Sequence, residues 1–432
     1  MSDVLTAKVR CLLPGGDALV DISSQHISHK TCLVRQAIPG DVLSLSNIHK
    51  RRSIARASFS SVEESSDKRV HAKCSVAASC GGCALQYLHV NEHAEIKSQW
   101  VHDAFSKTIT KDSQWLPIQQ MDMHDESQHR RRVRWHIGRN KQGQVILGFR
   151  GYQSHDVIEA EFCMVITSEL DALRKALQLA FIGSAFETHE MPESVYAVQL
   201  STGIHVVLEY EGTCHMELMP DIAWQGMVLQ CWCRDKQGLR ALNKPVYQLY
   251  DKLPAGLADI AVHIGPDDFV QGQQRGNRMM IDQISSWSEG AKHVVDLFSG
   301  AGNLSLPLAA LGMQVLGAEV NMASVRAANA NAKRLKLSAT YQQADLFGRF
   351  DVSPFVGADV LIVDPPRKGA KNICSLMNRL LPKKVILVHC DVISGGRDAQ
   401  EMKQQGYVLH ALRALDLFPY SGHVESMSLW TC

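Results

Sequence analysis

The sequence predicts a multidomain α/β protein with a Rossmann-like carboxyl-terminal domain. The stretch 293–320 has the order strand, glycine-rich turn, helix, strand and acidic residue, which is typical of a nucleotide-binding βαβ unit. Residues 1–62 contain five short strand patterns separated by turn residues, which predicts a small OB-like barrel. Between them, residues 63–266 combine clustered cysteines with an arginine-rich strand, so we expect a central α+β domain there. The third domain is then 267–432.

Composition and charge limit the class of protein. The chain has 432 residues, of which 45% are hydrophobic and 21% charged, as in ordinary globular proteins. Its net charge is only +1, so basic residues are informative where they cluster. The start lacks the apolar region of a signal peptide, and no apolar run approaches the roughly 18–20 residues that span a membrane. We therefore expect a cytoplasmic monomer with no membrane contact.

The cysteines predict a metal centre. Without a secretory signal, twelve irregularly spaced cysteines favour metal ligands or reactive thiols over disulfides. Cys74, Cys80 and Cys83 share a short loop with two glycines, and Cys163 is the best candidate for a fourth ligand. Structural zinc sites usually take their ligands from two C-x2-C pairs, whereas here one cysteine is isolated in the sequence. We therefore favour a [4Fe–4S] cluster. The alternative is that these thiols are small buried hydrophobes.

Two basic segments are candidates for contact with nucleic acid. One follows the fourth strand of the barrel, where the alternative is a charged edge strand that resists aggregation. The other, 129–139, alternates arginines with Val133 and Trp135, and its five arginines in ten residues exceed what solubility requires. We favour phosphate contact for this strand over a solvated face. The candidate RNA contacts are Arg51, Arg52, Arg130, Arg131, Arg132 and Arg134.

The glycine-rich turn favours one nucleotide ligand over another. A dinucleotide fingerprint needs a third glycine where this chain has Ser305. Asp296, just before the turn, would repel a pyrophosphate but tolerate a sulfonium with an amino-acid tail, which favours S-adenosylmethionine over NAD. The alternative is a purely structural turn. Ligands of open α/β sheets bind beyond the carboxyl ends of the strands. We therefore expect one cleft to gather Asp296, Glu319, Asp345, Asp364 and Cys390.

A thiol beside a methyl donor suggests methylation of a pyrimidine at C5. C5 is a poor nucleophile until a thiolate adds to C6, and the C5 proton must afterwards leave to a base. Cys390 follows a buried strand and is the candidate nucleophile, although a buried core thiol is the alternative. The segment 418–426 supplies His423 and Glu425, which alternation would put on one face. On chemistry alone, either could be the base.

These residues together resemble the S-adenosylmethionine-dependent RNA uracil-5 methyltransferases, in particular the branch that carries a [4Fe–4S] cluster and acts on 23S ribosomal RNA. The resemblance covers nearly the whole chain, including a TRAM-type barrel, the DPPRKGA motif at 364–370 and the ending Gly-His-x-Glu-Ser. It implies Cys390 as nucleophile, Glu425 as base and the four cysteines as cluster ligands. It also allows the helix expected over 91–108 to pack on the methyltransferase domain. The cofactor contacts that it implies are Gln271, Phe298, Asn303, Glu319, Asp345 and Asp364.

The chain departs from that family at two places. Asp391-Val392 stands where Asn-Pro is usual after the nucleophile, and Ser299 where a cysteine is common. We expect an enzyme that forms 5-methyluridine in 23S ribosomal RNA. Methylation of transfer RNA is an alternative, although those relatives generally lack the barrel and the cluster. Amino-group methylation is disfavoured by Arg367 after the prolines, and a non-catalytic iron–sulfur RNA-binding protein by the pair of Cys390 and Glu425.

Overall fold

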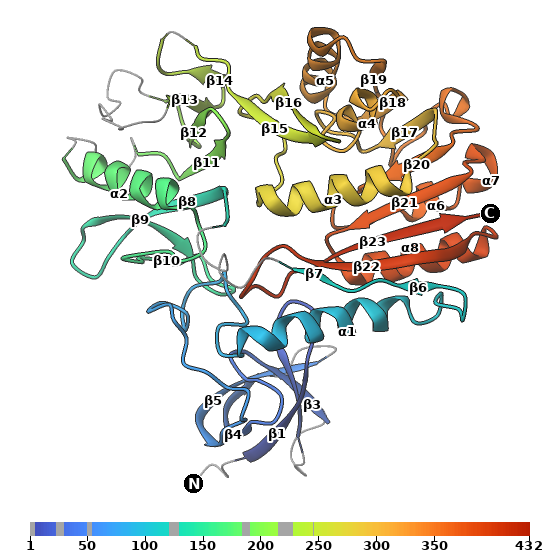
Figure 1. The fold of residues 1–432 in the computed structure, drawn as a ribbon. Coiled ribbons are helices and arrows are strands. Elements are labelled where there is room, and N and C mark those ends of the chain that lie inside the picture. Colours follow the sequence, from blue (N-terminus) through green and yellow to red (C-terminus); the bar gives the residue numbers. More distant parts are fainter. Residues whose placement is uncertain are drawn as a thin grey trace.

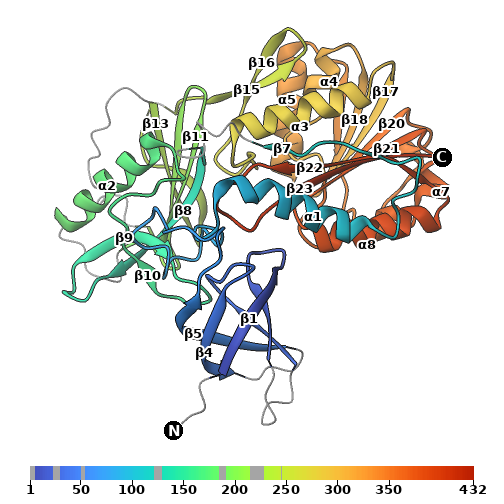
Figure 2. The ribbon, with the colours of Figure 1, turned by 60° about the horizontal axis from the view of Figure 1, so that its bottom comes forward.

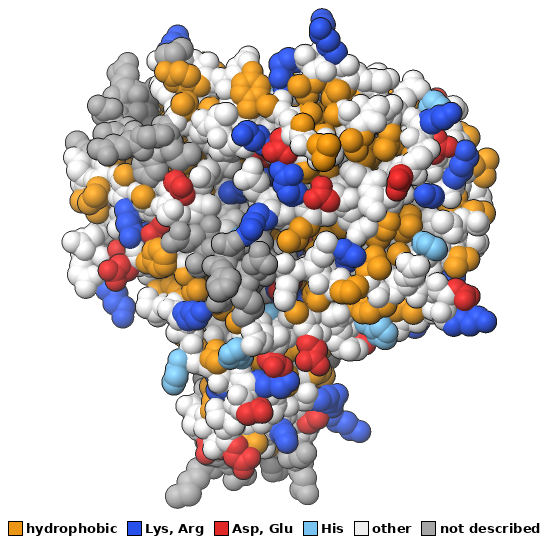
Figure 3. Space-filling model, in the orientation of Figure 1, with side chains coloured by type: hydrophobic (Ala, Val, Ile, Leu, Met, Phe, Trp, Pro, Cys, Tyr) orange, Lys and Arg blue, Asp and Glu red, His pale blue; other side chains and the backbone are white. Residues whose placement is uncertain are grey.

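The computed structural model describes residues 5–22, 30–49, 54–120, 129–183, 191–214, 228–244 and 246–432. The described chain forms a closed barrel, a seven-stranded sheet, a two-stranded hairpin and a nine-stranded sheet. The barrel projects from the two larger sheets, which lie side by side above it (Figures 1 and 2). Basic and acidic side chains are interspersed on the face drawn in Figure 3, in keeping with the small net charge.

The amino-terminal barrel closes in the order β1-β2-β3-β5-β4. Its strands are β1 (Leu5–Leu12), β2 (Ala18–Asp21), β3 (Thr31–Val34), β4 (Val42–His49) and β5 (Ala55–Glu64). Alternate residues of β1 and β2 point into a buried core, as expected for a small barrel filled by side chains.

The barrel extends slightly beyond its expected bounds. It is predicted over residues 1–62, but β5 continues to Glu64. The reason is pairing with β4, in which Val62 lies opposite Leu43 and Glu64 opposite Val42 across irregular steps in the register. Ladder hydrogen bonds to a neighbouring strand thus override the polar composition of this segment.

The central sheet has the order β10-β9-β8-β11-β12-β13-β14, and α2 (Ser168–Gly183) packs on it. Leu170, Leu173 and Leu177 of this helix share a core with Val133 and Trp135, which is the apolar face expected for the arginine-rich strand. The strands are β8 (Arg132–Arg139), β9 (Val145–Arg150), β10 (Val157–Ile158), β11 (Ser194–Leu200), β12 (Gly203–Glu209), β13 (Val228–Asp235) and β14 (Gly238–Ala241). The separate hairpin is β15 (Tyr250–Ala255) with β16 (Ala258–His263).

The carboxyl-terminal sheet has the order β19-β18-β17-β20-β21-β23-β22-β6, and β7 also pairs with β22. Strands β17 to β21 are parallel, whereas β23 is antiparallel to both of its neighbours. The strand order reverses between β17 and β20, which is the switch point where doubly wound sheets bind ligands. The strands are β17 (His293–Leu297), β18 (Gln314–Glu319), β19 (Ala339–Gln343), β20 (Val360–Val363), β21 (Lys384–His389), β22 (Val408–Asp416), β23 (Glu425–Thr431), β6 (Gln114–Trp115) and β7 (Gln119–Gln120).

Helices cover both faces of this sheet because its parallel strands are apolar on both sides. Helices α3, α4 and α5 form one core with alternate strand residues, and α1, α7 and α8 form another with the remaining ones (Figure 2). The α-helices are α1 (His93–Phe105), α3 (Gln274–Trp287), α4 (Leu306–Ala310), α5 (Met322–Leu335), α6 (Lys371–Cys374), α7 (Met377–Leu380) and α8 (Val392–Gln404). Short 3-10 helices are η1 (Val90–Glu92) and η5 (Ser353–Phe355).

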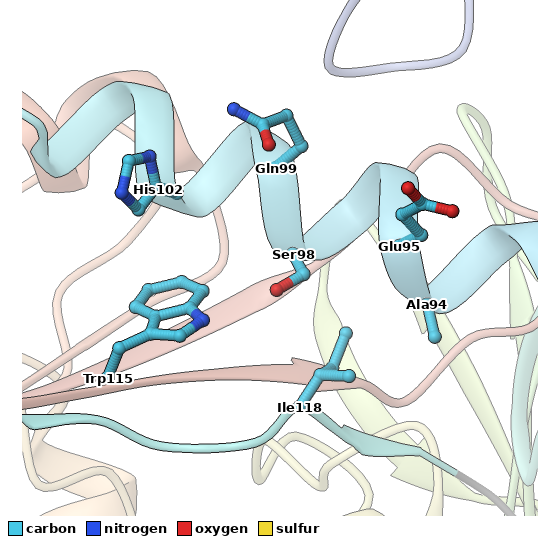
Figure 4. Close-up of a pocket in the computed structure, with 7 residues that line it drawn as sticks. All are labelled: Ala94, Glu95, Ser98, Gln99, His102, Trp115 and Ile118. Carbon is cyan, nitrogen blue, oxygen red and sulfur yellow. The ribbon is translucent and has the colours of Figure 1, made fainter.

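Helix α1 lies between the barrel and the carboxyl-terminal sheet (Figure 1). The indole nitrogen of Trp100 donates to the carbonyl of Leu12 in the barrel over 2.8 Å. On the sheet side, the fully buried ammonium of Lys97 lies 2.6 Å from a carboxylate oxygen of Asp416. The helix also lines a shallow pocket with Trp115 and Ile118 (Figure 4). Among the described helices, none has an apolar stretch long enough to cross a bilayer.

Candidate active site

The glycine-rich turn follows β17 and is shaped by positive φ angles. Phe298, Gly300 and Gly302 have φ values of 64°, 53° and 85°. A Cβ at Gly302 would lie 2.8 Å from the hydroxyl of Tyr341, so this turn requires glycine there for space as well as for conformation. At the end of β18, one carboxylate oxygen of Glu319 accepts from the nitrogen of Gly300 over 3.1 Å. The acidic residue and the turn therefore meet as predicted for a βαβ unit.

Asp296 is a buried carboxyl group beneath this turn. Burial raises its pKa to about 7, with Asp364 and Glu319 adding to the rise and the Ser305 hydroxyl opposing it. Within the described chain, neither of its carboxylate oxygens receives a well-formed hydrogen bond. A buried carboxylate is costly unless it is paired. The site is therefore suited to a ligand that brings a positive charge or hydrogen-bond donors.

Other predicted cofactor contacts line the same edge of the sheet. Asn303 exchanges two amide hydrogen bonds of 2.8 Å with Asn277 of α3. The ring centroid of Phe298 lies 5.2 Å from that of Phe347, whose backbone nitrogen donates to the exposed carboxylate of Asp345 over 3.0 Å. Sequence reasoning missed Asn277 and Phe347, because neither belongs to a strand end or to a motif.

Cys390 and Glu425 come together through strand pairing. Antiparallel β21 and β23 place His389 opposite Ser426, so the residue after β21 lies beside the residue that begins β23. Glu425 is buried, and burial raises its pKa to about 7 while Arg367 opposes the rise. Burial, then Glu425 and Asp364, raise the pKa of the Cys390 thiol to about 12, and again Arg367 opposes them. Arg367 thus places a positive charge in this pocket.

Asp364 completes the acidic pocket at the end of β20. Burial, with the charge of Glu425 in addition, raises its pKa to about 8. By contrast, His423 is exposed and precedes β23. The prediction that alternation puts His423 and Glu425 on one face was wrong, because the strand begins only at Glu425. The geometry therefore selects Glu425 as the carboxyl group that faces Cys390.

Short polar contacts hold the chain on both sides of Cys390. The imidazole of His389 lies 3.1 Å from a carboxylate oxygen of Asp398, which also accepts from the backbone nitrogen of Ala370. This pair ties the end of β21 to the loop 364–370. After Cys390, the carboxylate of Asp391 accepts from the nitrogen of Ser394 over 2.9 Å and caps α8.

The four predicted ligand cysteines line one small cavity. Cys74, Cys80 and Cys83 come from one loop, and Cys163 faces them from the segment before α2. Phe149 is among the apolar side chains that complete the lining. Burial raises the pKa of the thiols of Cys80, Cys83 and Cys163, to about 12 for Cys83. No set of three or more ligand side chains with the geometry for one metal ion occurs among the described residues.

The arginine-rich strand borders a groove of about 590 Å³ between the central and carboxyl-terminal sheets. Each of three arginines lies over an aromatic ring, namely Arg130 over Phe418, Arg132 over Phe269 and Arg134 over Tyr196. Arg134 is exposed, while the other two are half-buried. Cationic and aromatic groups that alternate along a groove are suited to nucleic-acid backbones and bases. The predicted contacts Arg51 and Arg52 lie outside the described residues.

Comparison with known proteins identifies the family. A sequence profile of the family described as tRNA (Uracil-5-)-methyltransferase matches residues 248–431. A protein of Shewanella halifaxensis named 23S rRNA (uracil(1939)-C(5))-methyltransferase RlmD is 30% identical over 421 residues, covering 94% of this chain and 92% of its own length. The chain belongs to the S-adenosylmethionine-dependent RNA uracil-5 methyltransferases, in their 23S ribosomal RNA branch.

Two further matches agree with this assignment. The protein of the same name from Halomonas elongata is 29% identical over 424 residues, covering 94% of this chain and 86% of its own length. The crystal structure of Pyrococcus abyssi tRNA (uracil-54, C5)-methyltransferase in complex with S-adenosyl-L-homocysteine superposes with a TM-score of 0.74. It covers 99% of this chain and 100% of that one at 19% identity, so the two share a fold over their whole length.

One predicted RNA contact of this methyltransferase is contradicted by the structure. The side chain of Arg131 is buried, lies 2.8 Å from Asp251 and donates through Nε to the carbonyl of Gln271 over 3.0 Å. Its strand neighbours Arg132 and Arg134 point to the other face, as alternation requires. Arg131 therefore joins the central sheet to the segment before α3 and is not available to RNA. Gln271, also buried, is fixed by this contact.

The departure after the nucleophile has a local explanation. Asp391 is the N-cap of α8 and Val392 its first residue. Asn-Pro, usual in the family, suits the same two positions, because asparagine and aspartate both cap helices well and proline is favoured at the first helical residue. The replacement therefore keeps the helix start directly after Cys390.

Proposed function

We propose that this protein forms 5-methyluridine in 23S ribosomal RNA, with S-adenosylmethionine as the methyl donor. The observation that carries the proposal is the juxtaposition of Cys390 with a buried Glu425 at neighbouring strand ends. C5 methylation of a pyrimidine needs this combination of nucleophile and base. Family membership supports the choice of RNA over small pyrimidines, and the names of the relatives support 23S ribosomal RNA.

The proposed reaction has three steps. The Cys390 thiolate adds to C6 of uracil, and the ring electrons form an enolate. C5 then takes the methyl group from the sulfonium, which leaves S-adenosylhomocysteine. Finally the Glu425 carboxylate accepts the C5 proton, the C5–C6 double bond re-forms and the C6–S bond breaks, which returns the thiolate. The target uridine must leave its base stack to reach the thiol.

The electrostatics of the pocket fit this order of events. A thiol whose pKa is raised to about 12 is protonated at neutral pH, so the nucleophile needs positive charge nearby. Arg367 supplies one charge, and the sulfonium of the donor would supply another. Glu425, with a pKa of about 7, is close to ideal for a general base at neutral pH.

For the methyl donor, we propose that Asp296 balances its positive charge and that Glu319 holds the ribose hydroxyls. The unpaired oxygens of Asp296 and the strand-end position of Glu319 support these roles. The remaining proposed contacts are Gln271, Phe298, Asn303, Asp345 and Asp364.

Replacing Asp296 by Asn should separate ligand binding from stability. Burial favours the protonated form of the Asp296 carboxyl group. The stability that this group contributes is therefore fully present below the usual aspartate pKa of about 4, and it is lost as the pH rises through about 7. At pH 8 the ligand-free variant should thus be more stable by roughly 1–3 kcal/mol, and equal to the wild type near pH 4. Its affinity for S-adenosylmethionine should fall about tenfold or more.

Thermal unfolding across pH and calorimetric titration would measure both quantities. Asp112→Asn, at an exposed position, is the matched control and should change neither. A D296N protein that binds the donor as tightly as the wild type would disprove the role of this carboxylate.

We also propose that Cys74, Cys80, Cys83 and Cys163 hold a [4Fe–4S] cluster. The shared cavity and the all-thiol donor set support it, since such clusters are held by four thiolates. When bound, the cluster would cross-link the loop of Cys74, Cys80 and Cys83 to the segment before α2. None of the three proposed reaction steps transfers an electron, so this role is structural.

Anaerobic purification should yield about four iron and four sulfide per chain, with charge-transfer absorption in the visible. Cys163→Ser should lose the iron and lower the melting temperature. The control, Cys432→Ser, changes an exposed cysteine outside the cavity and should retain the iron. Stoichiometric zinc without iron in the wild type would refute the cluster.

For RNA binding, we propose contacts from Arg132 and Arg134 in the groove and from Arg51 and Arg52 of the barrel, which we assign to the TRAM type. The positions of both side chains along the groove, with Arg134 exposed and Arg132 half-buried, support the first pair. Because the proposed substrate is ribosomal RNA, we also propose that the protein acts in the cytoplasm. We propose in addition that it acts as a monomer.

The decisive test uses methyl-labelled S-adenosylmethionine with unmodified 23S ribosomal RNA and, separately, transfer RNA. We expect labelled 5-methyluridine after nucleoside digestion of the ribosomal RNA only. Label confined to transfer RNA would overturn the substrate and favour a transfer RNA methyltransferase. No 5-methyluridine from either RNA would overturn the enzymatic function and favour a non-catalytic RNA-binding protein.

A further inference from the structure

The loop between β22 and β23, residues 417–424, is where the separate parts of the molecule meet. We call it the base loop, because β23 begins with Glu425. From α1, the ammonium of Lys97 donates to the carbonyl of Phe418 over 3.0 Å. From the barrel, the nitrogen of Gly15 donates to the carbonyl of Gly422 over 3.1 Å. Both ends of the base loop are therefore held by elements far away in the sequence.

The cysteine loop, residues 73–86, holds the middle of the base loop. The backbone nitrogen of Leu85 donates to the carbonyl of Tyr420 over 2.8 Å, and the ammonium of Lys73 lies 3.3 Å from the Tyr420 hydroxyl. Tyr420 is buried and has a φ of 64°. A tyrosine in this region of backbone conformation is strained and persists only where its surroundings fix it. The contacts from the cysteine loop provide that fixation.

Arg130 forms a second bridge from the cysteine cavity to the base loop. Its guanidinium lies 5.0 Å from the ring centroid of Phe418. The same groove is lined by Cys83, Cys163, Arg130 and Phe418, so the arginine stands where the cysteine cavity approaches the base loop. Arg134, on strand β8, is exposed, whereas Arg130 precedes that strand and is half-buried against the ring. Its position suits packing better than phosphate contact.

The two proposed reacting groups are thus positioned by different contacts. The chain around Cys390 is held by the cap from Asp391 and by the pair of His389 and Asp398. Glu425 instead follows directly on the base loop. Loosening the base loop should therefore disturb proton removal and leave thiolate addition largely intact.

We propose that Arg130 and the cysteine loop clamp the base loop, which makes Arg130 a positioning residue for the general base Glu425. This inference rests on the proposed uridine methylation. It gives Arg130 a packing role in place of the expected RNA contact, and it gives the cysteine loop a task in catalysis without any step through a bound metal. The step affected is transfer of the C5 proton to Glu425, after which the C6–S bond breaks.

The test compares Arg130→Gln with the wild type in the full-length protein. The glutamine removes the cation from the Phe418 ring, an interaction worth up to about a factor of ten in rate. We expect the covalent protein–RNA adduct, seen on denaturing gels, to form at nearly the wild-type rate and to decay about tenfold more slowly. The dissociation constant for the RNA should change by less than about threefold, because no phosphate contact is lost.

Three further variants make the outcome decisive. Arg130→Lys keeps a cation over the ring and should restore most of the decay rate. Lys73→Gln, which loosens the base loop from the cysteine loop, should slow decay in the same direction. Arg134→Gln should instead weaken RNA binding and leave adduct decay unchanged. Wild-type decay in R130Q, or loss of RNA affinity without slower decay, would overturn the inference. A wild type that forms no 5-methyluridine would overturn the proposed function itself.

Discussion

Cys390→Ala should abolish both 5-methyluridine formation and the covalent adduct with RNA. Without the thiolate, C6 has no nucleophile and C5 stays unreactive toward the sulfonium, so the rate should fall by on the order of 10⁴-fold or more. The thiol lies beside Glu425 and Arg367, where no other cysteine of the described chain could replace it. S-adenosylmethionine should still bind, because Cys390 is not among its proposed contacts, which lie before α3, in the glycine-rich turn and at the ends of β17 to β20.

Single-turnover methyl transfer and denaturing gels measure the two losses separately. Cys432→Ala serves as the control, because it removes an exposed thiol outside the pocket and should behave as the wild type. A covalent adduct that persists in C390A would mean that another group attacks the uracil.

The sequence predicted the nucleotide-binding half of the fold closely because its signals are local. The order strand, turn, helix and strand predicted for 293–320 is found as β17, the glycine-rich turn, α4 and β18, and helix α5 (Met322–Leu335) follows. The helix begins where the Asn321 side chain accepts from the nitrogens of Ala323 and Ser324, a cap that can be read from residue type. The carboxyl ends of parallel strands lie at one edge of the sheet. The strand pattern of the sequence therefore also predicted that Asp296, Glu319 and Asp364 lie close together.

What the sequence could not predict depends on partners that are distant along the chain. Arg131 looked like Arg132 and Arg134, and only its ion pair with Asp251 on a separate hairpin explains its burial. Similarly, alternation over 418–426 was wrong for His423, because the base loop is fixed by contacts from elements that lie hundreds of residues away. Periodicity describes a strand once it exists, but it does not say where tertiary contacts let the strand begin.

Glu425→Gln should trap the enzyme on its substrate. Addition and methyl transfer do not need the carboxylate, but removal of the C5 proton does, so turnover should fall by roughly 10²–10⁴-fold while methylated adduct accumulates. The amide has nearly the same shape as the acid and carries no charge in its buried site. Folding should therefore be kept. Glu289→Gln, at an exposed position on the same domain, is the matched control and should turn over normally.

The pH dependence gives a second test of this role. A pKa of about 7 means that Glu425 is a carboxylate, able to accept the proton, only above that pH. In the wild type the adduct should hence live longer as the pH falls below 7, whereas in E425Q its lifetime should not vary with pH in this range. Stability runs the opposite way, since burial favours the protonated acid and the stability that it gives is lost as the pH rises through about 7. E425Q should remove this loss of stability at high pH. If E425Q released its RNA at the wild-type rate, another group would have to be the base.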